Sequence, residues 1–230
     1  MNKKLILFDI DGTLILTGGV AVGVMVESVS RVLQRPIQWT ISDFVGNTDQ
    51  SILFTLFRRN GGIEPMLDDM VEQALSLYLK QLRKELAKDG IVQVLPGVKK
   101  LLKKMEKTPE FALGLVSGNV REGARIKLSS EKLFKYFPIG AFGDDALKRE
   151  NLPPFAISRA EKYYGCFFDR SNIWIVGDSV NDIKCAHANR LRCLAVASGH
   201  EKEAELQKHH PTKLLSNLLD TEQVIKCLAS

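Results

Sequence analysis

The strongest constraint on the fold is an apolar run that ends abruptly in two acids. The run from Leu5 to Phe8 is followed at once by Asp9, Ile10 and Asp11. A short, wholly apolar run is typical of a strand buried on both faces of a parallel sheet, and open α/β sheets bind ligands where such strands end. An unpaired buried carboxylate is very costly. The sequence therefore predicts a metal, a phosphate or acid–base chemistry at this strand end.

Further apolar runs of strand length alternate with helical patterns along the chain. This alternation is typical of βαβ units and predicts an α/β fold with a doubly wound, mostly parallel, Rossmann-like sheet. With the first strand central, the expected strand order is 3-2-1-4-5. The expected strands are residues 5–8, 112–116, 139–142, 173–176 and 193–197, with a weaker strand near 213–215.

The stretch between the first two strands behaves differently. Residues 67–86 show helical spacing of apolar residues, and residues 22–33 and 51–58 also suit helices. About 70 residues without a convincing strand is far more than a crossover needs. We therefore predict an inserted helical cap domain at residues 17–88. Residues 1–16 and 89–230 would together form the α/β core domain.

Composition limits the partners and the location. The 230 residues carry a net charge of +5, but the basic residues are scattered, and those between Lys99 and Lys107 suit the solvated face of one helix. No nucleic-acid-binding motif is present, so we expect no nucleic-acid partner. The four cysteines form no zinc or disulfide pattern, and the first apolar run is too short for a signal peptide or a membrane span. A cytoplasmic protein without a membrane partner is expected, either a monomer or a homodimer.

Two other strand ends carry polar groups. The second strand runs into Ser117-Gly118-Asn119, where a glycine allows close approach of a backbone N–H to an anion and the neighbours add side-chain donors. The fourth runs into Gly177-Asp178, with Asp182 one helical turn further on. If these strands flank the first, Asp9, Asp11, Ser117 and Asp178 meet at one edge. Three carboxylates there require a divalent cation, and oxygen ligands suit Mg²⁺.

The motif set resembles that of the haloacid dehalogenase-like hydrolase superfamily. It comprises D-x-D-G-T-L from Asp9, a hydroxyl at the end of the second strand, and G-D-S-x-x-D from Gly177. The inserted segment is similar to the helical cap of that superfamily. Within it the chain looks most like the phosphoglycolate phosphatase-like group.

The resemblance implies an Mg²⁺-dependent phosphatase that acts on a small phosphorylated metabolite, with phosphoglycolate as a possible substrate. Asp9 would attack phosphorus and Asp11 would serve as general acid and base. Mg²⁺ would bind Asp9, the backbone carbonyl of Asp11, and Asp178, with Asp182 supporting the site rather than binding the ion. The phosphate would be held by Thr13, Ser117, Gly118 and Asn119.

One position departs from the family pattern. Relatives of this group carry Lys-Pro-x-Pro after the third strand, whereas Asn151 stands here where the lysine is expected. Arg149 is our candidate for the missing cation, because a guanidinium can reach the same phosphoryl oxygens. Lys148 is the alternative, and it also remains open that both are surface charges.

The cap loop around Thr48 resembles the loop that faces the active site in relatives. Thr48 and Asn47 are therefore candidates for contacts with the non-reacting end of the substrate. Arg58 and Arg59 are read as a solvated helix face, with pairing to a substrate carboxylate as the alternative.

Two other functions remain open. A β-phosphoglucomutase-like phosphomutase would share every core motif. A non-catalytic regulator that binds a phosphorylated ligand is the alternative from another class, but a pure binder gains nothing from Asp9 and Asp11 as nucleophile and acid.

Overall fold

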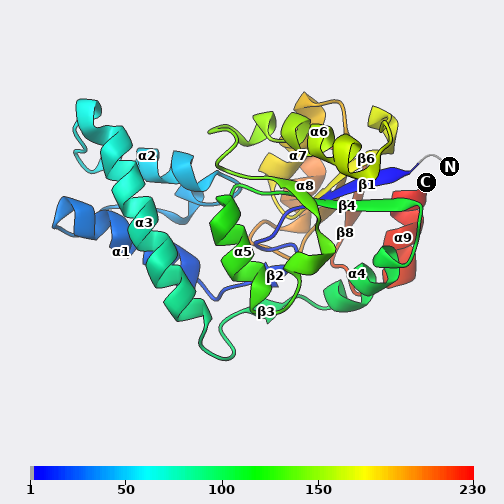
Figure 1. Ribbon diagram of the computed structural model, residues 1–230, viewed down its shortest axis with the longest axis horizontal. Coiled ribbons are helices and arrows are strands. Elements are labelled where there is room, and N and C mark those ends of the chain that lie inside the picture. Colours follow the sequence, from blue (N-terminus) through cyan, green and yellow to red (C-terminus); the bar gives the residue numbers. More distant parts are fainter. Residues whose placement is uncertain (1–2) are drawn as a thin grey trace.

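The computed structural model describes residues 3–230 and contains a six-stranded parallel sheet in the order β5-β4-β1-β6-β7-β8 (Figure 1). This arrangement confirms the predicted doubly wound α/β fold and the strand order 3-2-1-4-5, to which the weaker predicted strand adds an edge. The strands are β1 (Lys4–Phe8), β4 (Phe111–Val116), β5 (Ile139–Ala141), β6 (Ile173–Gly177), β7 (Arg192–Val196) and β8 (Lys213–Leu215).

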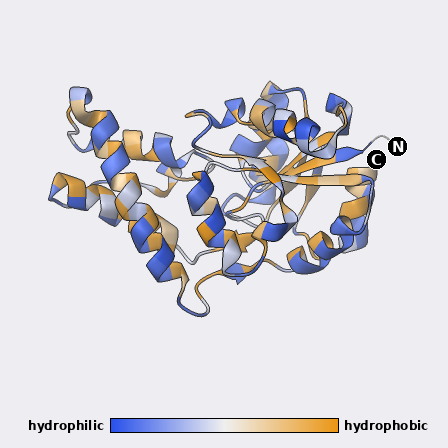
Figure 2. Ribbon diagram, in the orientation of Figure 1, coloured by the Kyte–Doolittle hydropathy of each residue, from blue (hydrophilic) through white to orange (hydrophobic). Residues whose placement is uncertain are grey.

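The sheet is buried on both faces, as the apolar runs predict. Successive side chains of a strand point to opposite faces. Ile6 and Phe8 accordingly join the core beneath α4, α5 and α9, whereas Leu5 and Leu7 pack under α6, α7 and α8. Figure 2 shows the central strands as largely hydrophobic and the covering helices as mixed. These helices are α4 (Val98–Glu106), α5 (Arg121–Ser129), α6 (Pro153–Tyr164), α7 (Val180–Ala188), α8 (Glu203–Lys208) and α9 (Thr221–Ala229).

The segment between β1 and β4 is mainly helical. Its helices α1 (Val20–Leu33), α2 (Asp49–Arg59) and α3 (Leu67–Leu86) lie together to one side of the sheet (Figure 1). Their apolar faces pack on one another, and α3 also contacts α5. We call this helical segment the cap. Its exact bounds at 17 and 88 stay a prediction, and the first two residues of the predicted core segment 1–16 lie outside the described residues.

A small ribbon joins the cap to the sheet. Strands β2 (Ile15–Leu16) and β3 (Gln93–Val94) pair antiparallel, with Ile15 opposite Val94. The sequence prediction contained neither strand, because two residues are too few to show the alternation by which a strand is recognised. The ribbon fixes the two connections of the cap close together.

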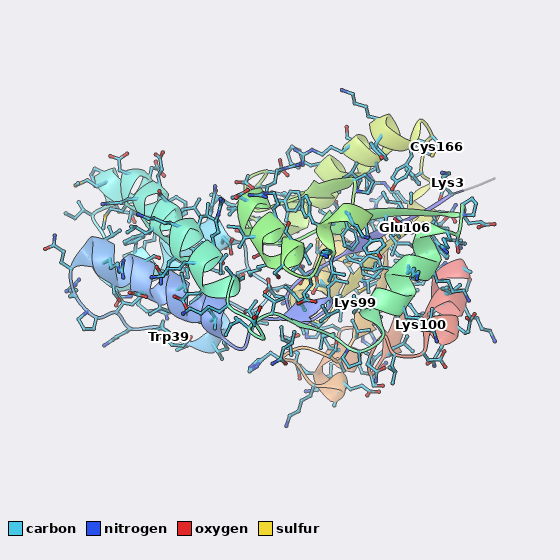
Figure 3. The ribbon with its side chains drawn as sticks, turned by 60° about the horizontal axis from the view of Figure 1, so that its bottom comes forward. Lys3, Trp39, Lys99, Lys100, Glu106 and Cys166 are labelled. Atoms are coloured by element: carbon cyan, nitrogen blue, oxygen red, sulfur yellow. The ribbon has the colours of Figure 1, made fainter. Side chains whose placement is uncertain are left out.

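The basic cluster on α4 faces away from the core. The side chains of Lys99 and Lys100 project from this helix (Figure 3), and Lys103, Lys104 and Lys107 are likewise exposed. This confirms the predicted solvated helix face. Within residues 3–230, no helix combines the length and apolar character that are needed to cross a membrane.

Candidate functional site

The predicted site residues meet at one edge of the sheet. Phe8, the last residue of β1, lies beside Leu115 of β4 and Val176 of β6. Because all three strands are parallel, the loops that follow them emerge at the same edge. The first loop carries Asp9 and Asp11, the second Ser117 to Asn119, and the third Asp178.

Asp9 is a buried carboxylate at the centre of this edge. Asp9 is only 6% exposed. Burial raises the pKa of its carboxyl to about 6, although the nearby Arg149 acts to lower it. A guanidinium nitrogen of Arg149 lies 3.0 Å from Asp9 Oδ1. That oxygen nevertheless accepts no hydrogen bond from the described residues. This oxygen can therefore accept a contact from a ligand.

Arg149, rather than Lys148, lies next to Asp9. Arg149 opens the 3-10 turn Arg149–Asn151 and is buried, whereas Lys148 is exposed. Its guanidinium also pairs with Asp182. Burial alone would lower the pKa of Arg149, but Asp182 and Asp9 outweigh it and raise the pKa, so the side chain stays charged.

Asp182 supports this cation from the start of α7. Its Oδ2 accepts hydrogen bonds from the Ser179 backbone N–H at 3.0 Å and from the Ser179 hydroxyl at 2.6 Å, while its Oδ1 faces Arg149. The Ser179 hydroxyl in turn accepts from the Asp182 N–H, which completes a capping box. Because both carboxylate oxygens are engaged, the placement supports the predicted role of Asp182 as a brace rather than a ligand.

The backbone closes tightly around Asp178. The Thr13 hydroxyl donates to Asp178 Oδ1 at 2.8 Å. A Cβ at Gly12 or Gly199 would lie 2.2 Å or 1.6 Å from Asp178 Oδ2, so a larger residue at either position would displace this carboxylate. Burial raises the pKa of Asp178 well above its usual value.

The acids fit a divalent cation. Carboxylate oxygens of Asp9 and Asp178, the two predicted side-chain ligands, lie within 4.8 Å of each other, and an oxygen of the brace Asp182 lies within the same distance of both. When these carboxyl groups are ionised, the single charge of Arg149 does not balance them. Asp9 also offers an oxygen without a hydrogen-bond donor. Hard oxygen donors of this kind suit Mg²⁺. The carboxylate of Asp11, by contrast, points to a different partner.

That partner is Lys127, a residue that the sequence prediction missed. Its Nζ lies 2.9 and 2.7 Å from the two carboxylate oxygens of Asp11 and 2.6 Å from Asn119 Oδ1. The Asn119 amide donates to Asp11 Oδ2 at 2.7 Å and to Ser117 Oγ at 2.9 Å. Lys127 is 4% exposed on α5. Lys127 lies one turn after Gly123 on the inward face of that helix. This spacing was the available sequence signal that the lysine faces the site.

The cap loop is tied to the loop after β4. The Asp49 N–H donates to the Gly118 carbonyl at 2.7 Å, and the Val120 N–H donates to Asp49 Oδ2 at 2.9 Å. A Cβ at Gly118 would lie 2.1 Å from the Asn47 carbonyl oxygen, so glycine is needed for this contact. Burial raises the pKa of Asp49 to about 6. The cap therefore closes directly over the candidate phosphate-binding loop.

Two predicted substrate-binding residues have other partners. The Thr48 hydroxyl donates to the Leu147 carbonyl at 2.7 Å and caps α2 by accepting from the Ser51 N–H. The Thr13 hydroxyl serves Asp178. Neither threonine is among the described residues that line the cavity between the cap and the strand ends. Asn47, the other predicted residue of the cap loop, does line it.

This cavity has a volume of about 370 Å³ and reaches from the acids to the cap helices. Ser117, Gly118, Asn119 and Arg149 line its core end together with Asp9, Asp11 and Asp178. A site of this size accommodates a small molecule.

Comparison with known proteins decides the family. Residues 6–196 match the sequence model of haloacid dehalogenase-like hydrolases. The chain belongs to the haloacid dehalogenase-like hydrolase family. The resemblance predicted from the motifs is thus confirmed.

Curated and structural relatives of this haloacid dehalogenase-like hydrolase agree with the assignment. The chain is 25% identical to a phosphoglycolate phosphatase of Pseudomonas syringae, and the match covers 94% of this chain and 77% of that protein. It is 26% identical to phosphoglycolate phosphatase 1 of Pseudomonas aeruginosa, over 94% of this chain and 78% of that protein. These matches confirm the predicted phosphoglycolate phosphatase-like group and an enzyme of the phosphatase class.

Solved structures show the same fold. A hydrolase from Pseudomonas syringae superposes with a TM-score of 0.72 at 19% identity, over 99% of this chain and 100% of that one. A haloacid dehalogenase-like protein from Streptococcus pneumoniae gives 0.71 at 18% identity, over 97% and 99%.

Proposed function

We propose that this hydrolase cleaves phosphate monoesters of small metabolites with the help of Mg²⁺, through an aspartyl-phosphate formed on Asp9. The observation that carries the proposal is the buried Asp9 carboxylate, which has an oxygen without a hydrogen-bond donor. The second acid, Asp11, follows two residues later, and the donors after β4 lie at the same edge. A binding protein would need only the donors.

The metal would be held by Asp9, the backbone carbonyl of Asp11, and Asp178. When bound, it would neutralise phosphoryl charge that otherwise repels a carboxylate nucleophile. Thr13 would contribute by fixing the Asp178 carboxylate at 2.8 Å. Arg149 would hold Asp9 and neutralise phosphoryl oxygens.

In the first step a carboxylate oxygen of Asp9 forms a bond to phosphorus and the bond from phosphorus to the ester oxygen breaks. Asp11 must enter this step protonated, and it donates that proton to the departing oxygen. In the second step Asp11 takes a proton from water, whose oxygen attacks phosphorus and releases Asp9 with inorganic phosphate. Ser117, the Gly118 amide and Asn119 would donate hydrogen bonds to the phosphoryl oxygens. The phosphate would then lie within reach of both acids.

Hydrolysis of para-nitrophenyl phosphate tests this function. We expect turnover with Mg²⁺ and its loss in EDTA, with recovery when Mg²⁺ is added back. Turnover that is unchanged by EDTA would contradict the metal site. Turnover that needs a bisphosphate activator would indicate a phosphomutase, and no turnover at any pH would favour a binding protein.

The physiological substrate is a finer question. Phosphoglycolate is the substrate suggested by the names of the curated relatives, and a substrate survey must include it. A cytoplasmic location, the absence of nucleic-acid and membrane partners, and a monomeric or dimeric state stay predictions from the sequence.

Replacement of Lys127 by Met tests whether this lysine positions Asp11. The variant removes the cation that holds both Asp11 oxygens. We expect the single-turnover rate of alcohol release from an alkyl phosphate to fall about 10²-fold, within the range of general acid catalysis. para-Nitrophenyl phosphate should lose much less, because its leaving group hardly needs a proton.

The control variant is Arg125→Met, which removes an exposed cation from the same helix. It should leave both rates unchanged. Equal losses in the rate of alcohol release from both esters in Lys127→Met would contradict a role through Asp11 as general acid.

A further inference from the structure

The cavity under the cap has two chemically different ends. Its core end is polar and holds the acids, the phosphate-binding loop and Arg149. The opposite wall comes from the cap and the segment leading to it and is mainly apolar. That wall includes Ile15, Val22, Met25, Phe44, Val45 and Ile52. In the proposed mechanism the phosphate occupies the core end, so the alcohol part of the substrate faces this wall.

The one lysine and the one arginine among the described cavity-lining residues already have partners. Lys127 Nζ lies within 2.9 Å of both Asp11 oxygens and of Asn119 Oδ1. Arg149 pairs with Asp9 and Asp182. His200, which also lines the cavity, is an exposed residue that follows β7 and does not belong to the cap.

The cap adds no cation to this wall. Among the described cavity-lining residues between 17 and 88, none is a lysine or an arginine. Arg59 pairs with Asp43 and Arg58 with Glu64 at 3.0 Å, and neither lines the cavity. The alternative that they bind a substrate carboxylate therefore finds no support.

The ionisable groups that the cap does contribute supply no positive charge for a second anion. The Asp49 carboxyl lines the cavity and accepts the hydrogen bond of the Val120 N–H, which is therefore not free to bind a substrate. Tyr78, whose ring is buried, also lines this end, and burial raises its pKa. It is therefore a neutral hydroxyl. A substrate carboxylate here would be desolvated with no cation of the cap to pair with, and it would face the Asp49 carboxyl, which is costly.

We propose that the substrate is a phosphate monoester whose alcohol part is uncharged and largely apolar. The inference rests on the proposed phosphatase function and assigns the wall from Ile15 to Ile52 as the subsite for that alcohol. A cavity of about 370 Å³ holds an alcohol larger than glycolate. Phosphoglycolate, whose small alcohol part carries a carboxylate, is thus a poor match for this chain.

A matched pair of esters tests the proposal on the intact protein. Isobutyl phosphate has the same branching and heavy-atom number as phosphoglycolate, with two methyl groups in place of the carboxylate oxygens. We expect kcat/KM for isobutyl phosphate to be at least about 10-fold higher. Phosphoglycolamide, which lacks the charge, should fall between them. An equal or higher value for phosphoglycolate would overturn the inference while leaving the phosphatase function intact.

A binding measurement separates the two claims. Isopentylphosphonate and phosphonopropionate replace the ester oxygen by a methylene group and are not hydrolysed. With Mg²⁺ present, calorimetry should show tighter binding of isopentylphosphonate. If no ester is turned over, the proposed function fails, and this preference still decides the nature of the subsite. Tighter binding of phosphonopropionate would overturn it.

Introducing a cation gives the sharpest control. Val22→Lys places an amine on the wall, and Val26→Lys places the same amine one turn along α1, outside the cavity lining. The two valines are both half-buried. Val22→Lys should reduce the preference for isobutyl phosphate at least about 10-fold, and Val26→Lys should leave it unchanged. The same preference in both variants would contradict the subsite.

Discussion

Replacement of Asp9 by Asn is expected to reduce phosphate ester hydrolysis by about 10⁴-fold or more, because an amide cannot attack phosphorus and losing a nucleophile costs this much in other hydrolases. The fold should survive. Asn keeps the shape of the side chain, and Arg149 retains its pairing with Asp182. Turnover of para-nitrophenyl phosphate and thermal unfolding together check the expectation.

The matched control is Asp89→Asn, the same change at an exposed site between α3 and β3. It should be fully active. Appreciable turnover in Asp9→Asn, above that of a preparation carrying Asp9→Ala, would refute Asp9 as the nucleophile.

Replacement of Arg149 by Ala should lower turnover by roughly 10³-fold, in the range found when an arginine is removed from a phosphoryl-transfer site. It also leaves Asp9 and Asp182 buried without their partner. Breaking a buried ion pair in this way destabilises a protein by about 3–5 kcal/mol, so the free energy of unfolding should fall as well. Activity assays and urea unfolding of the same samples measure both effects.

Lys148→Ala removes the adjacent, exposed cation and should change neither quantity appreciably. Arg149→Lys keeps the charge and should recover part of the stability but little of the activity, because an ammonium lacks the planar set of donors that a guanidinium offers to phosphoryl oxygens. A larger loss in Lys148→Ala than in Arg149→Ala would transfer the cation role to Lys148.

The strand ends of the site could be predicted because parallel topology brings them together whatever the details of packing. Asp9, Ser117 and Asp178 each follow an apolar run. The parallel pairing of β1 with β4 and β6 brings the ends of these runs to one edge of the sheet. The cap could be predicted as helical from its spacing alone. The ribbon of β2 and β3 could not, since two-residue strands show no pattern.

Helical spacing could place Lys127 on the inward face of its helix, but the contacts that Lys127 and Asp49 make depend on how the helices pack. Lys127 reaches Asp11 through the rotation of α5 about its axis, and Asp49 reaches Val120 only when the cap sits on the loop after β4. The predicted phosphate contact of Thr13 likewise depended on a rotamer, which directs its hydroxyl to Asp178. Topology thus fixes which loops meet, while packing decides which side chains touch.

Chemical trapping of the phosphorylated residue tests the central claim most directly. The protein is mixed with an ester and Mg²⁺, quenched in acid, reduced with borohydride and analysed by peptide mass spectrometry. An aspartyl-phosphate is reduced to homoserine, which we expect at position 9, and only when Mg²⁺ was present. Homoserine at position 11, or unmodified Asp9 in a preparation that turns the ester over, would contradict the account.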